Sequence, residues 1–354
     1  MMNKVDVNVI KGTLSAPGLD KVIVKPEVIS ANYYGLKDNE DVQLKIEGAT
    51  VPILDHKTGE YKEVNRIYIR DNFVFKNLTV GTKRINGTPQ QHCYLDLTRV
   101  GLDDNNLIPL SIEKFKEHTD KCIEYIESRY DVVLDKNRYK GESMEINTNI
   151  RLERSFNEYK HILGLMHDLR KKGFKGQKYE NEEKECTGFK LFNDSMSIKI
   201  YNKTIQLETQ KNIPIYDEVM RVEVAFLTQN KINDMFGTCY IEEITDIQLK
   251  DVLLKVVEKE LFKPLEKYIK NTNKELKKIA KEEKERDIRK WKRSFLLRGG
   301  YKAFDTQQIL DIIKAESPKN YNRDIKKLQS DIEELTDLHD NLLKFTEIKN
   351  KLFI

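Results

Sequence analysis

The sequence predicts an α+β fold, with helices on one face of an antiparallel sheet and a helical region at the C-terminal end. Residues 1–105 consist mainly of short β-branched or alternating segments that Gly- or Asn-rich breaks separate. From residue 244 onward, apolar residues recur at helical spacing. Between these regions a strand followed by a helix occurs twice, which suggests a degenerate structural repeat, that is, a pseudo-duplicated core.

Composition excludes integral membrane proteins and disulfide-stapled miniproteins. The chain has 354 residues, of which 34% are charged, and no apolar run approaches the roughly 20 residues that cross a bilayer. The N-terminus lacks the basic and apolar regions of a secretion signal. We therefore expect a cytoplasmic protein. Four cysteines at spacings that fit neither disulfides nor zinc are expected to be free thiols: Cys93, Cys122, Cys186 and Cys239.

The strands and helices are expected in the following order. In the N-terminal region, strands cover 22–24, 42–46, 66–69, 72–80 and 93–100. A helix begins at Ser111, and a second strand and helix cover 144–151 and 159–169. Strands follow over 195–207 and 219–226, and Pro264 should kink or divide the helical stretch 248–293. The chain therefore divides into a β-rich region, 1–105, an α+β core, 106–243, whose sheet can share strands with it, and a basic helical region, 244–354.

Positive charge is concentrated in the helical region. Residues 263–293 contain thirteen Lys or Arg and six Asp or Glu, an excess of seven, whereas the whole chain has a net charge of +4. Lysines at helical spacing can follow a DNA backbone, which would make binding strongly salt-dependent. A solvated helix with ion pairs four residues apart explains the pattern equally well. The candidate DNA-binding lysines are Lys270, Lys274, Lys277, Lys278 and Lys281.

Three of the expected strands carry unusual polar side chains on one face. The opposite face of each strand is apolar, as expected of a sheet that helices cover on one side. Carboxylates, lysines, arginines and a tyrosine would then gather on one open surface: Glu145, Asn147, Asn149 and Arg151; Lys199, Tyr201 and Lys203; Arg221 and Glu223. The alternative is a solvated sheet with cross-strand ion pairs.

A tyrosine among lysines and carboxylates indicates phosphoryl transfer. A phenol ionises near pH 10, so attack at neutral pH requires a neighbouring cation, which Lys199 and Lys203 can supply. Glu145 and Glu223 offer the oxygen ligands that suit Mg²⁺ or Mn²⁺. The product would be a phosphotyrosine ester, which a free 3′-hydroxyl can later attack to reseal a DNA strand.

Several segments resemble the phage and plasmid replication initiators of the gene II/X type. Residues 193–204 and 220–224 resemble the "S…(I/V)KIYDKT…LR(I/V)E" pattern of that family, and residues 144–159, 94–99 and 105–110 resemble its preceding blocks. The resemblance implies an endonuclease that nicks one strand of a double-stranded origin to start rolling-circle replication and then religates it. It also implies a host helicase and a polymerase as partners.

The same resemblance suggests the site residues. Tyr201 is the first candidate nucleophile, although this chain has Asn202 where the family pattern has Asp. Tyr216, next to two acids, is the rival. The expected DNA contacts on the strands are Arg221, Asn147 and Arg151. No His-hydrophobic-His metal motif occurs, which favours a site made of carboxylates.

Other functions remain open at this point. A non-catalytic protein can bind DNA through the basic helix and the open sheet, with the tyrosine stacking on bases. A toxin-like or structural protein would lack affinity for nucleic acids. No Walker-type motif is present, so unwinding would need a separate helicase. Expected helices over 305–314 and 322–349 fit either a helix-turn-helix or a dimerising hairpin, and the oligomeric state is not predicted.

Overall fold

The computed structural model describes residues 17–31, 45–54, 61–69, 75–85, 88–98, 107–130, 132–180, 186–211, 217–282, 314 and 337–353. The chain divides into two compact units, neither of which is continuous in sequence. Unit 1 comprises residues 1–151 and 192–253, and unit 2 comprises residues 152–191 and 254–354. The predicted boundaries near residues 105 and 243 divide the chain differently, and they stay predictions.

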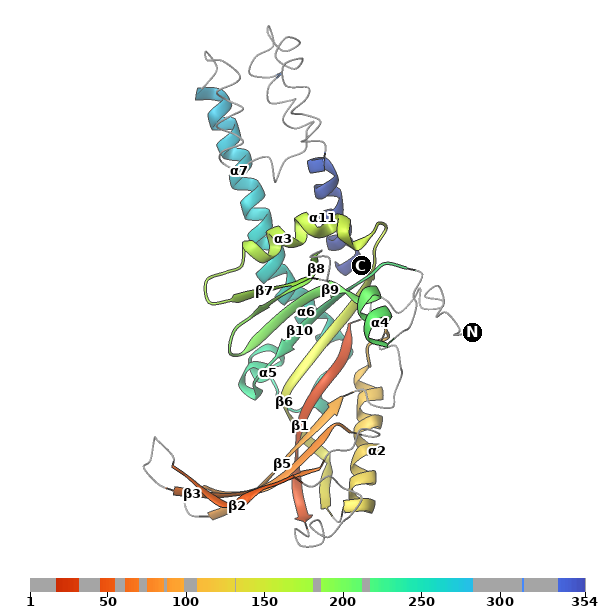
Figure 1. The fold of residues 1–354 in the computed structure, drawn as a ribbon, viewed down its shortest axis with the longest axis vertical. Helices are drawn as coiled ribbons and strands as arrows, with labels where there is room; N and C mark the ends of the chain where they lie inside the picture. The colour runs from red at the N-terminus through yellow and green to blue at the C-terminus, as the bar shows by residue number, and fades with distance from the viewer. Residues whose placement is uncertain are drawn as a thin grey trace. The chain divides into compact units, whose positions relative to one another are not determined.

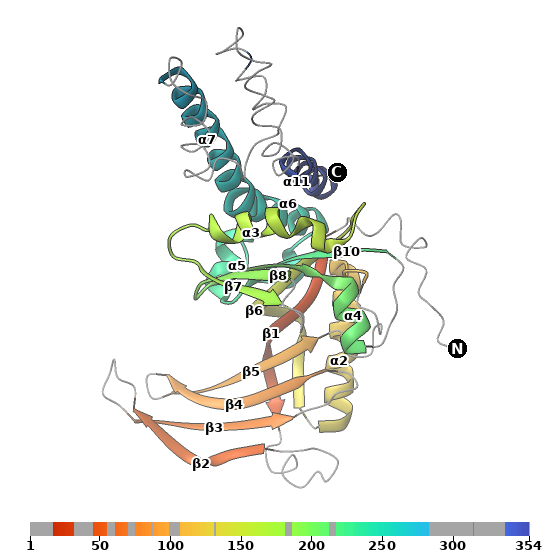
Figure 2. The ribbon, with the colours of Figure 1, turned by 45° about the horizontal axis from the view of Figure 1, so that its top comes forward.

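Unit 1 contains eight strands of an antiparallel sheet, which confirms the α+β class (Figure 1). Its strands lie in the order β2-β3-β4-β5-β1-β6-β10-β9. Their bounds are β1 (Gly18–Ala31), β2 (Lys45–Leu54), β3 (Tyr61–Ile69), β4 (Asn77–Ile85), β5 (Thr88–Thr98), β6 (Val132–Arg151), β9 (Met196–Asn202) and β10 (Val219–Phe226). Strands β2 to β5 follow one another as neighbours (Figure 2), and β1 joins them to β6.

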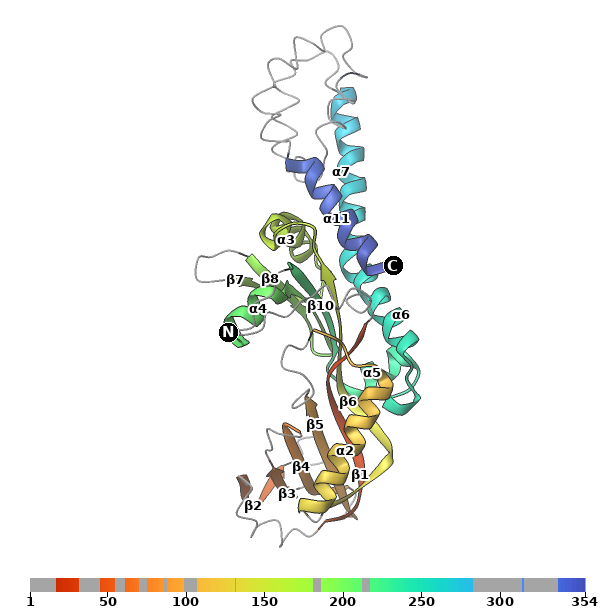
Figure 3. The same cartoon turned by 90° about the vertical axis from the view of Figure 1, so that its right-hand side faces the viewer.

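The apolar face of the central strands is covered by helices (Figure 3). Unit 1 contains α2 (Ile112–Tyr130), α4 (Lys203–Lys211), α5 (Gln229–Phe236), the 3-10 turn η3 (Ile241–Glu243) and the start of α6 (Asp246–Val257). Phe226 of β10 meets Phe236 of α5 edge to face, with ring centroids 5.7 Å apart. A Cβ at Gly141 of β6 would lie 2.7 Å from Ile241 Cδ1, so glycine lets η3 pack directly on the strand.

The sequence explains where the helices of unit 1 begin and end. Ser111 Oγ accepts a hydrogen bond from Lys114 N at 3.3 Å, as expected of the residue before α2. Thr228 caps α5 in the same way, and Gly237 ends it in the left-handed conformation with φ +78°. The strand expected over 195–207 ends early: Asn202 Oδ1 accepts from Ile205 N at 3.0 Å and starts α4.

Unit 2 contains two neighbouring strands and several helices. They are η2 (Phe156–Tyr159), α3 (Lys160–Asp168), β7 (Lys175–Glu180), β8 (Cys186–Phe192), a π-helical turn η4 (Glu258–Phe262), α7 (Lys263–Glu282) and α11 (Asp337–Phe353). Pro264 lies directly after the π-helical turn, in the first turn of α7. The residues on both sides of this turn are helical, so the chain is helical without a break from Asp246 to Glu282 and the stretch is not divided at Pro264. The irregular π-helical turn before Pro264 is the local change that the missing N–H of proline favours.

Hydrogen bonds to the side chain of Glu347 hold helix α11 to the segment around η2, within unit 2. Tyr159 Oη donates to Glu347 Oε2 at 2.5 Å, and Glu153 N donates to Glu347 Oε1 at 3.0 Å. The helix expected over 305–314 lies outside the described residues except for Lys314, as does the start of the helix expected from 322. Among the helices described, none has the length and hydropathy of a membrane span.

Candidate active site

The polar residues of three strands meet on the face of the sheet opposite α2, α5 and α6 (Figure 3). Strand β10 lies between β6 and β9, and its register sets which residues are opposite one another. Two rows of Cα partners result: Tyr201, Arg221 and Asn149 in one, and Lys199, Glu223 and Asn147 in the next. Because side chains alternate along a strand, both rows point to the same face. The predicted neighbourhood of these strands is therefore present.

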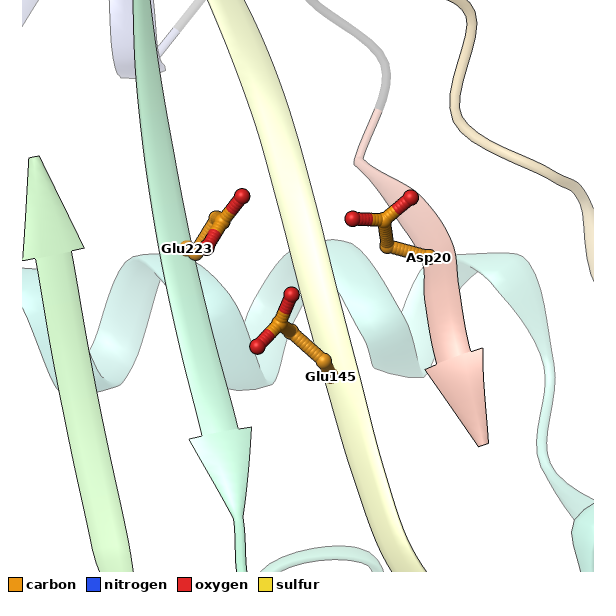
Figure 4. A group of neighbouring side chains, drawn as sticks. All are labelled: Asp20, Glu145 and Glu223. Carbon is orange, nitrogen blue, oxygen red and sulfur yellow. The ribbon is translucent and has the colours of Figure 1, made fainter. Parts of the chain in front are cut away.

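Three carboxylates converge at the centre of this face (Figure 4). Asp20 of β1, Glu145 of β6 and Glu223 of β10 each offer an oxygen, and these oxygens lie within 4.8 Å of one another. We call Asp20, Glu145 and Glu223 the carboxylate cluster. Asp20 reaches it because a register shift between Leu19 and Lys21 interrupts the alternation of β1. Asp20 was not predicted from the sequence, where its only signal is an acid two residues after Gly18, at the start of the strand.

Lys199 joins two members of the carboxylate cluster. Its Nζ lies 2.9 Å from Glu145 Oε2 and 2.7 Å from Glu223 Oε2. Burial opposes its charge, but attraction to Glu223 and Glu145 outweighs burial and raises the pKa of Lys199 above its usual value. Burial and the negative charge of Glu223 together raise the pKa of Glu145 to about 7. Glu145 therefore takes up a proton closer to neutral pH than an ordinary glutamate does.

The phenol of Tyr201 is held by Glu223. Tyr201 Oη donates a hydrogen bond to Glu223 Oε1 at 2.6 Å. Burial, followed by the negative charge of Glu223, raises the pKa of Tyr201 well above its usual value, and Arg221 offsets only part of this. The phenol is therefore neutral in this arrangement, and the carboxylate that receives its hydrogen bond is also placed to accept its proton.

Arg221 lies beneath the cluster with a fully buried side chain. Its Nε donates to Asn149 Oδ1 at 2.8 Å, while its Nη1 lies 3.6 Å from Asp20 Oδ2 and 3.9 Å from Glu223 Oε1. A buried cation requires compensating negative charge, and here two of the three carboxylates provide it. Arg221 and Lys199 together leave the cluster with a formal charge of −1 when all three carboxylates are ionised.

Among the residues that the structure describes, the Asp20 carboxylate oxygen Oδ1 and the Asn147 amide have no hydrogen-bond partner. Asp20 Oδ1 is buried and unpaired, and so are both the Oδ1 and the Nδ2 of Asn147, whose side chain is fully buried. Leaving a buried polar atom unpaired costs about 1–3 kcal/mol, and a bound water or ion is one way in which a protein satisfies such an atom. Three carboxylates with an unsatisfied oxygen are a suitable ligand set for a hard divalent cation. The residues present therefore fit a Mg²⁺ or Mn²⁺ ion.

The polar face is not the open surface that we expected. Arg221 and Asn147 were predicted to contact DNA, but both residues are 0% exposed. The segment Leu107–Leu110 contributes to this, since Asn149 Nδ2 donates to Leu107 O. Partial exposure remains at Lys199 (24%) and Glu145 (16%). A substrate would therefore approach the cluster at these residues.

Other predicted site residues lie elsewhere. Lys203 is the first residue of α4, so it does not follow the strand alternation that aligns Lys199 with Tyr201; it is buried and donates to Gln206 Oε1 at 2.9 Å. Arg151 is 43% exposed and pairs with Asp217 at 2.6 Å. Tyr216, the rival nucleophile, lies outside the described residues.

The candidate DNA-binding lysines belong to α7 of unit 2. Lys270 and Lys274 are exposed on that helix. Lys277, Lys278 and Lys281 fall within the helix, but their side chains are outside the described part of the chain. The predicted role of these lysines stays a prediction.

Comparisons with known proteins give a similarity to solved structures and none to a family or a curated protein. No protein family matches the sequence, and no curated protein does. A solved structure of a rolling circle replication initiator protein from Geobacillus stearothermophilus is similar over 69% of this chain and 84% of that chain, with a TM-score of 0.34 and 12% sequence identity. A similarity at this level does not assign the chain to the gene II/X type, which remains a prediction.

Proposed function

We propose that this protein is a DNA strand-nicking and joining enzyme that initiates rolling-circle replication. The observation that carries the proposal is the hydrogen bond from Tyr201 to Glu223 within the carboxylate cluster. It combines a nucleophile, a group that can accept its proton and a set of ligands for a divalent ion. This is the combination that tyrosine-mediated phosphoryl transfer requires.

In the proposed reaction, Tyr201 Oη attacks a backbone phosphorus while its proton passes to Glu223 Oε1. The bond between phosphorus and the 3′ oxygen breaks, solvent protonates the leaving oxygen, and a 5′-phosphotyrosine ester remains. The ester conserves the energy of the broken bond, so a free 3′-hydroxyl can reverse the step without ATP. Lys199 is the partly exposed cation beside the reacting atoms and would orient the phosphate.

The carboxylate cluster would hold Mg²⁺ or Mn²⁺ through Asp20, Glu145 and Glu223. A bound ion supplies positive charge that polarises the phosphate and favours the phenolate. This charge is needed, because burial and the negative charge of Glu223 raise the pKa of Tyr201. Adding a dication to a site of formal charge −1 reverses its sign, which lowers the cost of ionising Tyr201.

The test does not depend on knowing the origin. The full-length protein is incubated with a supercoiled plasmid library of random inserts and Mg²⁺, and covalent protein–DNA adducts are isolated under denaturing conditions. We expect adducts from wild type, none from Tyr201→Phe, and adducts from Tyr216→Phe, which is the matched control. An adduct that disappears with Tyr216→Phe and persists with Tyr201→Phe would move the nucleophile to Tyr216.

If wild type forms no adduct with either metal, the catalytic proposal is wrong. The alternative, a non-catalytic DNA-binding protein, then requires salt-dependent affinity for DNA without nicking. A host helicase and a polymerase would act with the catalytic protein, and that part of the proposal rests on the resemblance of its sequence segments to replication initiators.

A further inference from the structure

We propose that an exposed basic edge of unit 2 binds the sugar–phosphate backbone of duplex DNA. The basic edge consists of five cations within nine consecutive residues that include no acid: Arg170, Lys171, Lys172, Lys175 and Lys178. All five residues are exposed. The inference rests on the proposed function for the identity of its ligand, but it adds a DNA contact outside α7 and the carboxylate cluster.

The first part of the basic edge is a tight turn. Phe174 N donates to Lys171 O at 3.2 Å, and Gly173 has φ +98°, which fits the third position of a type II turn. Lys172 is therefore at the apex of the turn. A Cβ at Gly173 would meet no atom within 4 Å, so the space beside the apex is open. A phosphate can approach this turn without displacing protein.

The second part is β7, which is the last strand in the strand order and so has one edge without a partner strand among the described residues. Gly176 faces α3, because a Cβ there would lie 2.4 Å from His167 Nε2. Lys178, two residues on, shares that side and lies 3.7 Å from Asp168. Lys175 lies on the other side of the strand, away from α3.

The cations of the basic edge are only partly neutralised. Lys171 pairs with Glu260 at 3.1 Å, and Lys178 pairs with Asp168. Lys172 and Lys175 form no ion pair with any residue that the structure describes. Exposed pairs contribute little stability, about 0–1 kcal/mol, so Lys171 and Lys178 can exchange their carboxylates for phosphates at small cost.

A simpler explanation accounts for only part of this charge. Lysines on an edge strand discourage pairing with other chains, which explains Lys175 and Lys178. It does not explain the three consecutive cations that precede the strand, Arg170, Lys171 and Lys172, because a turn has no edge to protect. Repulsion among five neighbouring cations has a cost that a polyanionic ligand removes.

The test measures affinity for a fluorescently labelled duplex of arbitrary sequence by anisotropy, in EDTA so that no cleavage occurs. The full-length variant Lys172→Gln/Lys175→Gln is compared with Lys114→Gln/Lys121→Gln. The control removes the same charge from two exposed lysines of α2. Each phosphate contact contributes about 0.9 to the slope of log K against log salt, so the first variant should reduce the slope by about 1.8 between roughly 50 and 200 mM salt.

The control variant should keep the wild-type slope. Equal slopes for the two variants would overturn the inference, because net charge alone would then explain binding, while the proposed nicking activity would stand. If wild type itself does not bind duplex DNA, both the inference and the proposed function are wrong. The adduct experiment separates these cases, because it depends on Tyr201 and not on the basic edge.

Discussion

Glu223 connects the other groups of the candidate site. One of its oxygens receives the Tyr201 hydroxyl and the other receives Lys199, while Arg221 lies 3.9 Å away. These contacts follow from the register between β10 and β9. Glu223 lies opposite Lys199, and Arg221, two residues earlier on the same face of β10, lies opposite Tyr201. A single carboxylate therefore positions Tyr201, the proposed nucleophile, and would supply one ligand for the proposed ion.

The pH dependence of ion binding should report Glu145. Its pKa is raised to about 7, so below that pH the folded protein holds a proton that a divalent cation must displace. We expect Mn²⁺ affinity, measured by titration calorimetry, to rise about tenfold per pH unit up to about pH 7 and then level off. The Glu145→Gln variant should bind more weakly and lack this slope. An affinity that is independent of pH in wild type would contradict the assignment.

Arg221 should matter more for stability than Arg151. Arg221→Leu leaves Asp20 and Glu223 facing each other without their buried cation, which should cost about 3–5 kcal/mol of unfolding free energy in urea. Arg151→Leu, the control, removes a partly exposed pair and should cost about 0–1 kcal/mol. Equal losses for the two variants would show that the charge of Arg221 does not support the carboxylate cluster.

At the scale of elements, the alternating pattern predicted the strands that build the site and both ends of β10, but not where β6 begins or where β9 ends. Residues 144–151 were expected as a strand, but β6 begins at Val132, because its first part pairs with β1 through several register shifts that weaken the alternation. Asn202 was read as a departure from a family pattern. Its side chain caps α4, a role that Asn and Asp fill equally well.

The composition of the site was predictable for the residues that follow the alternation. Glu145, Lys199, Tyr201 and Glu223 were identified from it, and the structure brings them together. Asp20 was not identified, because it faces the site only through a β-bulge. A bulge depends on how two distant segments pair, so the sequence of β1 alone carries no fixed pattern that marks it. The burial of Arg221 was missed for a related reason: alternation gives the face of a residue and not what covers that face.

The attachment of α11 should depend on pH. Although burial disfavours its charge, hydrogen bonds from Lys351, Tyr159 and the Glu153 amide lower the pKa of Glu347. A lowered pKa adds stability above the unfolded-state value, about 4.3, and this stability is lost as the pH falls through the folded-state value. We expect faster amide hydrogen exchange in α11 on acidification.

The variant Glu347→Gln should lose about 1–3 kcal/mol of protection in α11 at neutral pH and respond less to acid. Glu153→Gln provides the control, because the Glu153 side chain is 70% exposed and its pairing with Lys351 should contribute little. Similar exchange in the two variants would mean that Glu347 does not hold the helix.

At the scale of the whole molecule, each unit is assembled from separated parts of the chain. Unit 2 combines an insertion, residues 152–191, with the C-terminal part, and α3 of the insertion contacts α7 and α11. The buried apolar residues of α3 are Ile162, Leu163 and Met166. Their cover is supplied by sequence about a hundred residues further on.

A chain that ends at residue 253 should therefore fail to protect the insertion. Removing α7 and α11 exposes the apolar side of α3, so we expect trypsin to cleave within residues 160–180 faster than in the full chain and a hydrophobic dye to bind. Unchanged cleavage would show that α3 is stable without the C-terminal helices.

The most direct test of the central claim is the position of Mn²⁺ in crystals, located by its anomalous scattering. We expect one ion bonded to oxygens of Asp20, Glu145 and Glu223, with Tyr201 beside it. No ion at these three carboxylates, in crystals grown at a Mn²⁺ concentration that supports adduct formation, would contradict the account.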